Sequence, residues 1–133
     1  MKQMSQRVVI TGIGWITPLG HNIETVWDAL LAGRSGVQLT RQFDASTFPT
    51  QFSAEVKSFD YRQFVANSDL HDGIGSNTAF ALGAAAQAWT HAALNSYPDL
   101  DVQRLGIYLG SGEGAVDFKN YFASNLSAWD DQR

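Results

Sequence analysis

A glycine-spaced loop after a short apolar run is the part of this sequence that could most readily do chemistry. The stretch VVITGIGWITPLG, residues 8–20, carries Gly12, Gly14 and Gly20. Where a strand leads into a glycine-rich turn and then a helix, backbone N–H groups can cradle a phosphate. A nucleotide site is therefore one hypothesis for this loop, and a tight structural turn is the other.

The spacing of the loop favours the structural turn. The dinucleotide pattern G-x-G-x-x-G needs a third glycine, and Thr17 stands in its place. The next helix is expected to begin only near Ile23, too far along the chain for its free N–H groups to reach the phosphate. The P-loop sequences Gly-Lys-Ser and Gly-Lys-Thr do not occur. We expect no cofactor, and a free-standing α/β nucleotide-binding module stays as an alternative.

Other reactive side chains are few. The 133 residues include no cysteine, so the chain itself contains no disulfide, thiolate metal ligand or cysteine nucleophile. His71 and His91 stand apart, without the spacing of metal ligands. We interpret His21 as a turn residue, His71 as a loop residue and His91 as a helix residue. No metal site is expected.

The composition is that of a globular domain with no evident charged partner. Hydrophobic residues make up 44% of the chain, charged residues 17%, and the net charge is −4. The nine basic residues are scattered, so we expect no nucleic-acid partner. No apolar run is long enough to span a bilayer, and the N-terminal MKQMSQR lacks a signal-peptide core. These features predict a cytoplasmic protein with no membrane partner.

Two strands and three helices are expected to carry the glycine turns. Residues 7–13 and 105–109 are apolar runs typical of buried parallel strands, and each leads into glycines. A helix capped by Asn22 and followed by Gly33 should bury one face, formed by Ile23, Val26, Trp27, Leu30 and Leu31. An alanine-rich helix is expected over residues 76–94, and an amphipathic helix from about Asp117.

Residues 35–72 form an irregular, aromatic-rich excursion between the first two helices. A short strand is expected near residues 52–56 and a short helix capped by Asp60. The order strand, helix, excursion, helix, strand, helix predicts an α/β fold with a parallel sheet. Two core strands are too few to make such a sheet stable on their own.

Several ordered motifs resemble the N-terminus of the β-ketoacyl-acyl-carrier-protein synthases. RVVITGIGWITPLGHNIETVWDALLAGRSGV is similar to the family's first strand, turn and helix. FDASTFPTQFSAEVKSFD resembles the next segment, and RLGIYLGSGEG resembles the second core strand with its glycine turn. The resemblance runs from Arg7 to about Gly114, and in this family the first glycine loop is structural.

The resemblance implies an incomplete N-terminal half of a thiolase-like fold, with parallel core strands and flanking helices over residues 1–133. The family condenses acyl and malonyl groups carried on acyl carrier protein, in fatty acid or polyketide synthesis. It uses a Cys and two His residues that match nothing in this chain, so no catalytic residue is assigned. We expect the chain to end before the nucleophile and to be inactive alone.

The same resemblance implies a homodimer for the full-length protein. The shorter chain is expected to self-associate differently, through unpaired strand edges or an exposed helix face. A non-catalytic partner subunit that resembles chain-length factors is a further alternative, in which the nucleophilic Cys would be replaced.

A possible acyl-pocket turn lies at Gly112, Glu113 and Gly114. Many relatives have an apolar residue that lines or gates the acyl chain where this sequence has Glu113. A carboxylate buried there without a partner would be costly, and a solvated turn residue is the alternative. The chain also departs from its relatives at Ile74-Gly75, where a basic segment with Met-Asp is usual.

Overall fold

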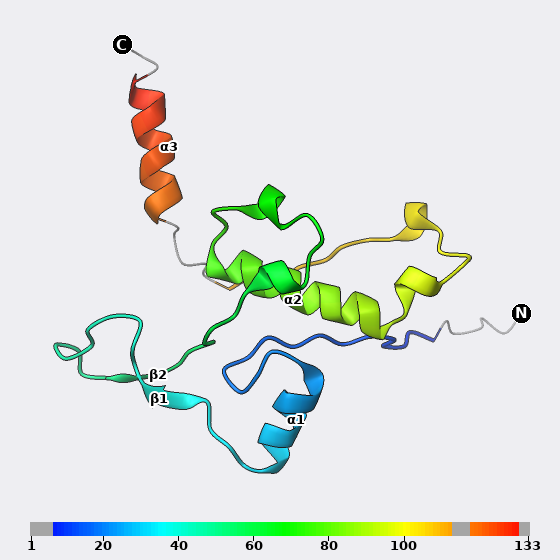
Figure 1. Ribbon diagram of the computed structural model, residues 1–133, viewed down its shortest axis with the longest axis horizontal. Helices are drawn as coiled ribbons and strands as arrows, with labels where there is room; N and C mark the ends of the chain where they lie inside the picture. The colour runs from blue at the N-terminus through cyan, green and yellow to red at the C-terminus, as the bar shows by residue number, and fades with distance from the viewer. Residues whose placement is uncertain (1–6, 113–117, 131–133) are drawn as a thin grey trace, which may run out of the picture.

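The computed structural model of the chain describes residues 7–112 and 118–130. Within these ranges α2 crosses the middle of the molecule, and α3 projects away from it (Figure 1). None of the helices described has the length and apolar content needed to cross a membrane. The elements in chain order are α1 (Ile23–Leu31), β1 (Val37–Leu39), β2 (Phe52–Ala54), η1 (Tyr61–Gln63), η2 (Ser68–His71), α2 (Ser76–His91), η3 (Leu94–Ser96), η4 (Val102–Arg104) and α3 (Phe118–Asp130), where η marks a 3₁₀ turn.

The first helix begins and ends where its sequence signals predict. The Asn22 side chain accepts a hydrogen bond from the Thr25 amide at 2.9 Å, and Gly33 follows the helix with a φ of 63°. Its buried residues are Val26 and Ala29. The predicted apolar face is only partly buried, because Trp27, Leu30 and Leu31 are exposed in a chain with few elements to cover them.

The sheet differs from the predicted one. β1 and β2 pair as an antiparallel hairpin, with Val37 opposite Ala54 and Leu39 opposite Phe52. The strand expected near residues 52–56 is confirmed in β2, but its partner was not predicted. The predicted parallel core is not found among the described residues, since 7–13 and 105–109 are not assigned as strands.

The two predicted core strands nevertheless keep their expected direction. Both run opposite to α2 and therefore parallel to one another (Figure 1). Neither has a ladder, because no backbone hydrogen bond joins residues 8–12 or 106–110 to any other described residue. Two strands alone make a parallel sheet too narrow to be stable. The two segments therefore do not form the backbone hydrogen bonds of a parallel ladder here.

The small packed region lies where α2 meets the aromatic excursion. The Phe59 ring lies 5.2 Å from the His21 ring and 5.5 Å from each of Phe64 and Phe80. Gly83 of α2 leaves room for it, because a Cβ at this position would lie 2.5 Å from Phe59 Cζ. The buried hydrophobic residues of the described chain are Val26, Ala29, Ala45, Tyr61 and Ala79.

The remaining boundaries follow local signals closely. The Asp60 side chain accepts from the Arg62 amide at 3.0 Å and caps η1, as expected. α2 begins at Ser76 as predicted but ends at His91 rather than Leu94, because Ala93 adopts a left-handed φ of 54° before η3. α3 begins at Phe118, next to Asp117, which lies outside the described residues.

Candidate functional site

A groove of about 550 Å³ lies between the first turns of α2 and the second glycine turn. Its lining mixes apolar side chains with neutral polar groups. Among its described lining residues none is ionisable, so acid–base chemistry would need groups from elsewhere. The lining residues are Asn77, Thr78, Phe80, Ala81, Leu109, Gly110, Ser111 and Gly112.

Of the three residues predicted to form an acyl-pocket turn, the structure describes Gly112. It is exposed and borders the groove. Glu113 and Gly114 lie outside the described residues, so their surroundings stay a prediction. The neighbouring Ser111 hydroxyl donates to the Gly112 carbonyl at 3.1 Å.

The first glycine loop lies against α2. A Cβ built on Gly12 would lie 2.8 Å from the Ala92 Cβ, and one on Gly14 would lie 2.8 Å from the Ala84 carbonyl carbon. Real Cβ atoms do not come so close to other heavy atoms, so only glycine permits this approach. The glycine spacing here serves the packing of a backbone segment against a helix.

Several amide groups of this loop donate hydrogen bonds within the chain. The Ile13 amide donates to His91 Nδ1 at 3.1 Å, and the Trp15 amide donates to Gln87 Oε1 at 3.4 Å. The Thr17 amide donates to the Gly20 carbonyl at 2.9 Å. A phosphate cradle needs such N–H groups free, so the geometry agrees with the structural interpretation of the loop.

Gln87 is the main polar link between α2 and the loop. Its side-chain amide donates to the His21 carbonyl at 2.7 Å and to the Trp15 carbonyl at 3.4 Å, while its oxygen accepts from the Trp15 amide. Sequence reasoning missed this residue. The available signal was one long polar side chain within a run of alanines on a helix expected to be closely packed.

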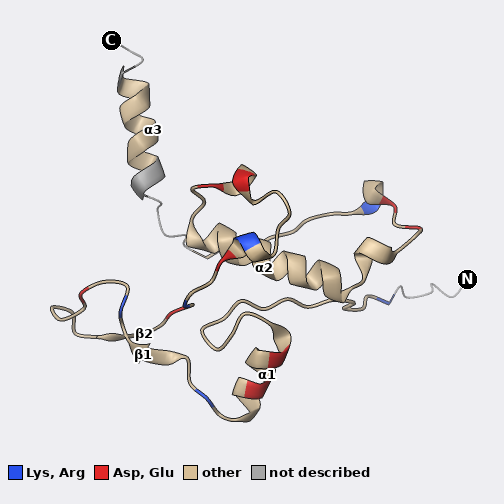
Figure 2. Cartoon of the chain, in the orientation of Figure 1, with Lys and Arg blue, Asp and Glu red and all other residues tan. Residues whose placement is uncertain are grey.

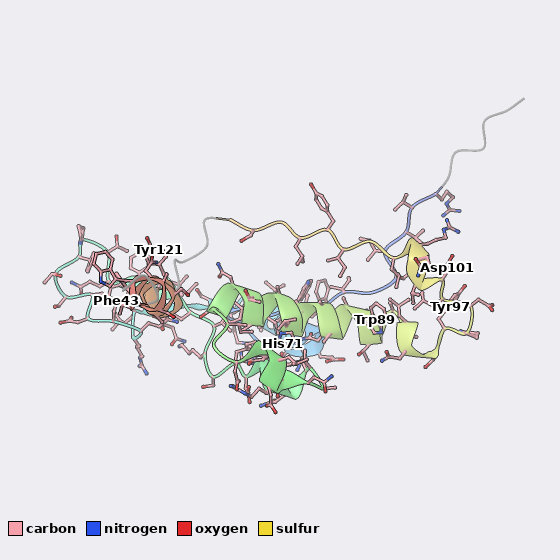
Figure 3. All side chains as sticks on the ribbon, turned by 90° about the horizontal axis from the view of Figure 1, so that it is seen from above. Phe43, His71, Trp89, Tyr97, Asp101 and Tyr121 are labelled. Carbon is pink, nitrogen blue, oxygen red and sulfur yellow. The ribbon has the colours of Figure 1, made fainter. Side chains whose placement is uncertain are left out.

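The three histidines make structural contacts in separate places. The His21 ring meets the edge of Phe59, His91 accepts from Ile13, and the His71 carbonyl accepts from the Tyr61 hydroxyl at 2.9 Å. In Figure 3, His71 lies beside α2 on the side away from residues 105–112. The part of the chain that the structure describes contains no cluster of three or more His, Asp or Glu residues able to hold a metal.

One carboxylate organises the β1–β2 hairpin. Glu55 Oε1 accepts from the Arg41 amide at 3.0 Å, the Gln42 amide at 3.3 Å and the Ser53 hydroxyl at 3.0 Å. The bond from the Arg41 amide is the main cause that holds the pKa of Glu55 below its ordinary value. Glu55 falls within the strand expected near residues 52–56 and directly follows β2, but its role was not predicted.

Residues 5–132 match the family model described as beta-ketoacyl synthase, N-terminal domain. The chain belongs to this family. Because the match covers almost all of its residues, the grooves and loops above are parts of a ketoacyl synthase N-terminal domain. The resemblance drawn from the glycine turns and the Thr17-Pro18-Leu19-Gly20 segment is confirmed.

Similar curated proteins are 3-oxoacyl-[acyl-carrier-protein] synthases of bacteria and plants. The chain is 40% identical over 125 residues to 3-oxoacyl-[acyl-carrier-protein] synthase 2 of Coxiella burnetii. This match covers 89% of this chain and 28% of that protein. It is 34% identical over 112 residues to the synthase 2 of Vibrio cholerae, covering 84% and 27%. A chloroplastic synthase I of Hordeum vulgare is 34% identical over 124 residues, covering 91% and 27%.

A solved structure shares the fold. The ishigamide ketosynthase/chain length factor matches with a TM-score of 0.63 and 27% identity, over 90% of this chain and 30% of that one. The chain thus spans little more than a quarter of the length of the curated relatives described above.

Proposed function

We propose that this chain supplies the N-terminal part of a 3-oxoacyl-acyl-carrier-protein synthase. In this proposal the whole protein is a cytoplasmic homodimer that joins acyl and malonyl groups carried on acyl carrier protein, with loss of carbon dioxide. The family match over residues 5–132 carries the proposal. The 40% identity to the Coxiella burnetii synthase supports this chemistry over other acyl transfers.

The role proposed for this chain is structural support and acyl-chain accommodation. It has no cysteine, so it cannot itself form the acyl-thioester intermediate of a cysteine-dependent condensation. The groove beside Gly110 and Gly112 offers Phe80 and Leu109 as apolar walls. These features support a role for the groove as one wall of the acyl site. The reacting groups would then come from other parts of the whole protein.

A chimeric enzyme tests this proposal directly. The matching N-terminal segment of the Coxiella burnetii synthase is replaced by this chain, and condensation of acyl- and malonyl-carrier protein is measured. We expect turnover from the chimera, and neither turnover nor a covalent acyl adduct from the 133-residue chain alone. Thermal unfolding of the chimera is recorded beside the parent enzyme, so that misfolding is recognised. A folded chimera that loads the acyl group yet never condenses it would contradict the proposal.

A second candidate is a non-catalytic partner subunit. It is favoured by the similar solved structure, whose description includes a chain length factor as well as a ketosynthase. The two candidates differ at the nucleophile of the whole protein. Incubation of that protein with an acyl donor, followed by intact-mass measurement, should give a covalent acyl adduct for a synthase and no adduct for a partner subunit.

The finer proposal concerns Glu113, which follows the groove-lining Gly112. A carboxylate that projects into the acyl site would disfavour long chains, because they would have to desolvate it. Glu113→Ile in the chimera is then expected to raise kcat/KM for longer acyl donors by about tenfold relative to short ones. An unchanged chain-length profile would place this carboxylate in solvent and leave the synthase assignment untouched.

A further inference from the structure

The first glycine loop and the C-terminal end of α2 meet at a histidine. The Ile13 amide donates to His91 Nδ1 at 3.1 Å, and this is the one hydrogen bond that residues 8–13 make to other described residues. In Figure 1 the blue segment of the loop runs past the end of α2. Attachment of this part of the loop therefore depends on one nitrogen lone pair, together with the close packing of Gly12 against Ala92.

The acceptor role of His91 defines the state of its ring. A ring nitrogen that accepts a hydrogen bond carries no proton, so His91 is neutral here and its proton lies on Nε2. A second proton would have to bind at Nδ1, where it would direct an N–H group at the N–H of Ile13. Protonation of the ring and attachment of the loop therefore exclude each other.

The charges around His91 come from other elements. α2 itself contains no Lys, Arg, Asp or Glu, whereas α1 carries acidic residues (Figure 2). A groove of about 490 Å³ lies beside His91, and among its described lining residues Glu24 of α1 is the one other ionisable group. Residues 12–15 and η3 contribute no ionisable side chain. Arg62 of η1 does not line the groove and pairs with Asp72 at 2.8 Å.

Two features of this position stabilise a positive charge on the ring when the loop is detached. His91 is the last residue of α2, and the carbonyl groups at the C-terminal end of a helix carry a partial negative charge. The carboxylate of Glu24 lines the same groove. His91 is also exposed, so water can deliver the proton directly. The ring nitrogen thus has two competing partners, the Ile13 amide and a proton.

We propose that His91 is a proton-sensitive latch, a side chain that holds the first glycine loop against α2 only while its ring is neutral. Protonation releases residues 12–13 as the pH falls through the range in which imidazoles gain a charge. Gln87 does not titrate, so its hydrogen bonds to Trp15 keep the next part of the loop attached. The inference goes beyond the proposed function, because release of the loop involves no condensation chemistry.

Solvent exchange of single amide protons, followed by NMR at about pH 7.5 and about pH 5.5, tests the latch. After correction for intrinsic exchange rates, we expect the Ile13 amide to lose protection about two- to tenfold at the lower pH, the change that corresponds to one net hydrogen bond. The Trp15 amide should keep its protection, because its acceptor is Gln87. Unchanged protection at Ile13, or an equal loss at Trp15, would overturn the proposal.

Two substitutions assign the effect to this ring. His91→Asn places an amide oxygen near the position of Nδ1 and has no proton to gain in this range, so the protection of Ile13 should be similar at both pH values. His71→Asn is the matched control and should keep the wild-type pH dependence, since His71 accepts from Tyr61 through its carbonyl. Circular dichroism checks that both variants keep their helices. A pH dependence that persists in folded His91→Asn would show that another group releases the loop.

The ring nitrogens of the wild-type chain give a readout that needs no variant. Their chemical shifts report which nitrogen carries a proton. We expect a neutral His91 ring with its proton on Nε2, and a gain of the second proton with the same midpoint as the loss of Ile13 protection. A neutral ring with its proton on Nδ1, or two separate midpoints, would contradict the latch.

Discussion

The two glycine segments of this chain, residues 8–14 and 105–112, have similar sequences and opposite surroundings. Each is an apolar run that leads into glycines separated by one residue. In the first, a Cβ on Gly14 would collide with the backbone of α2, whereas one on Gly110 or Gly112 would meet nothing within 4 Å. The same sequence pattern is therefore packed against α2 in the first segment and exposed in the second.

The polar groups of the two segments differ in the same way. The amides of Ile13 and Trp15 donate to His91 and Gln87 on α2. In the second segment, the amides of residues 106–110 have no partner among the described residues. The comparison shows that glycine spacing permits another backbone to approach closely, and that the rest of the fold decides whether one does.

The largest expected effect comes from adding one methyl group to each segment. Gly14→Ala should lower the free energy of unfolding by about 2–3 kcal/mol, because the new Cβ overlaps backbone atoms of Ala84 and Ala88 that cannot move aside cheaply. Gly110→Ala is the matched control and should change it by no more than about 0.5 kcal/mol. Urea unfolding followed by circular dichroism measures both. Equal effects would mean that α2 does not hold the first loop as described.

A smaller effect is expected from the side chain that ties the first segment to α2. Gln87→Ala removes hydrogen bonds to both backbone groups of Trp15 and to the His21 carbonyl. We expect a loss of about 1–3 kcal/mol in unfolding free energy, since part-buried polar groups are left unsatisfied. Gln103→Ala, at an exposed glutamine of η4, should have little effect.

Hydrogen exchange makes this second test specific to the loop. The Trp15 amide should exchange faster in Gln87→Ala, while amides in the middle of α1 keep their protection. If exchange at Trp15 were unchanged, Gln87 would not be the link between helix and loop.

The elements that local residues specify were predictable from the sequence. Asn22 and Gly33 bound α1, Asp60 caps η1, and Ser76 begins α2, because capping and left-handed conformations depend on near neighbours in the chain. The family assignment was predictable for a related reason. Short motifs in a fixed order can be recognised from the sequence without knowledge of the tertiary contacts around them.

The features that depend on distant parts of the chain were not predictable in this way. The predicted parallel sheet was wrong for the described residues, because apolar strands form a ladder only when neighbouring strands are present. β1 was missed since three residues carry little periodic signal. Gln87 and Glu55 act on residues that no sequence spacing connects to them. The acyl-pocket prediction at Glu113 stays a prediction, outside the described residues.

The smallest expected effect concerns the hairpin, where strands are paired by the chain itself. Hydrogen bonds, first that from the Arg41 amide, hold the pKa of Glu55 below its ordinary value. The stabilisation of the hairpin is therefore complete above the ordinary pKa of a glutamate, and it is lost as the pH falls through the lowered value. The amide chemical shifts of Arg41 and Gln42, followed by NMR during acid titration, should report this loss. Glu55→Gln should flatten the titration at both amides, and Glu24→Gln, on α1, should leave it in place. A titration that survives in Glu55→Gln would show that another group closes the hairpin, which would remove the contrast between this locally completed pair of strands and the open edge at residues 105–109.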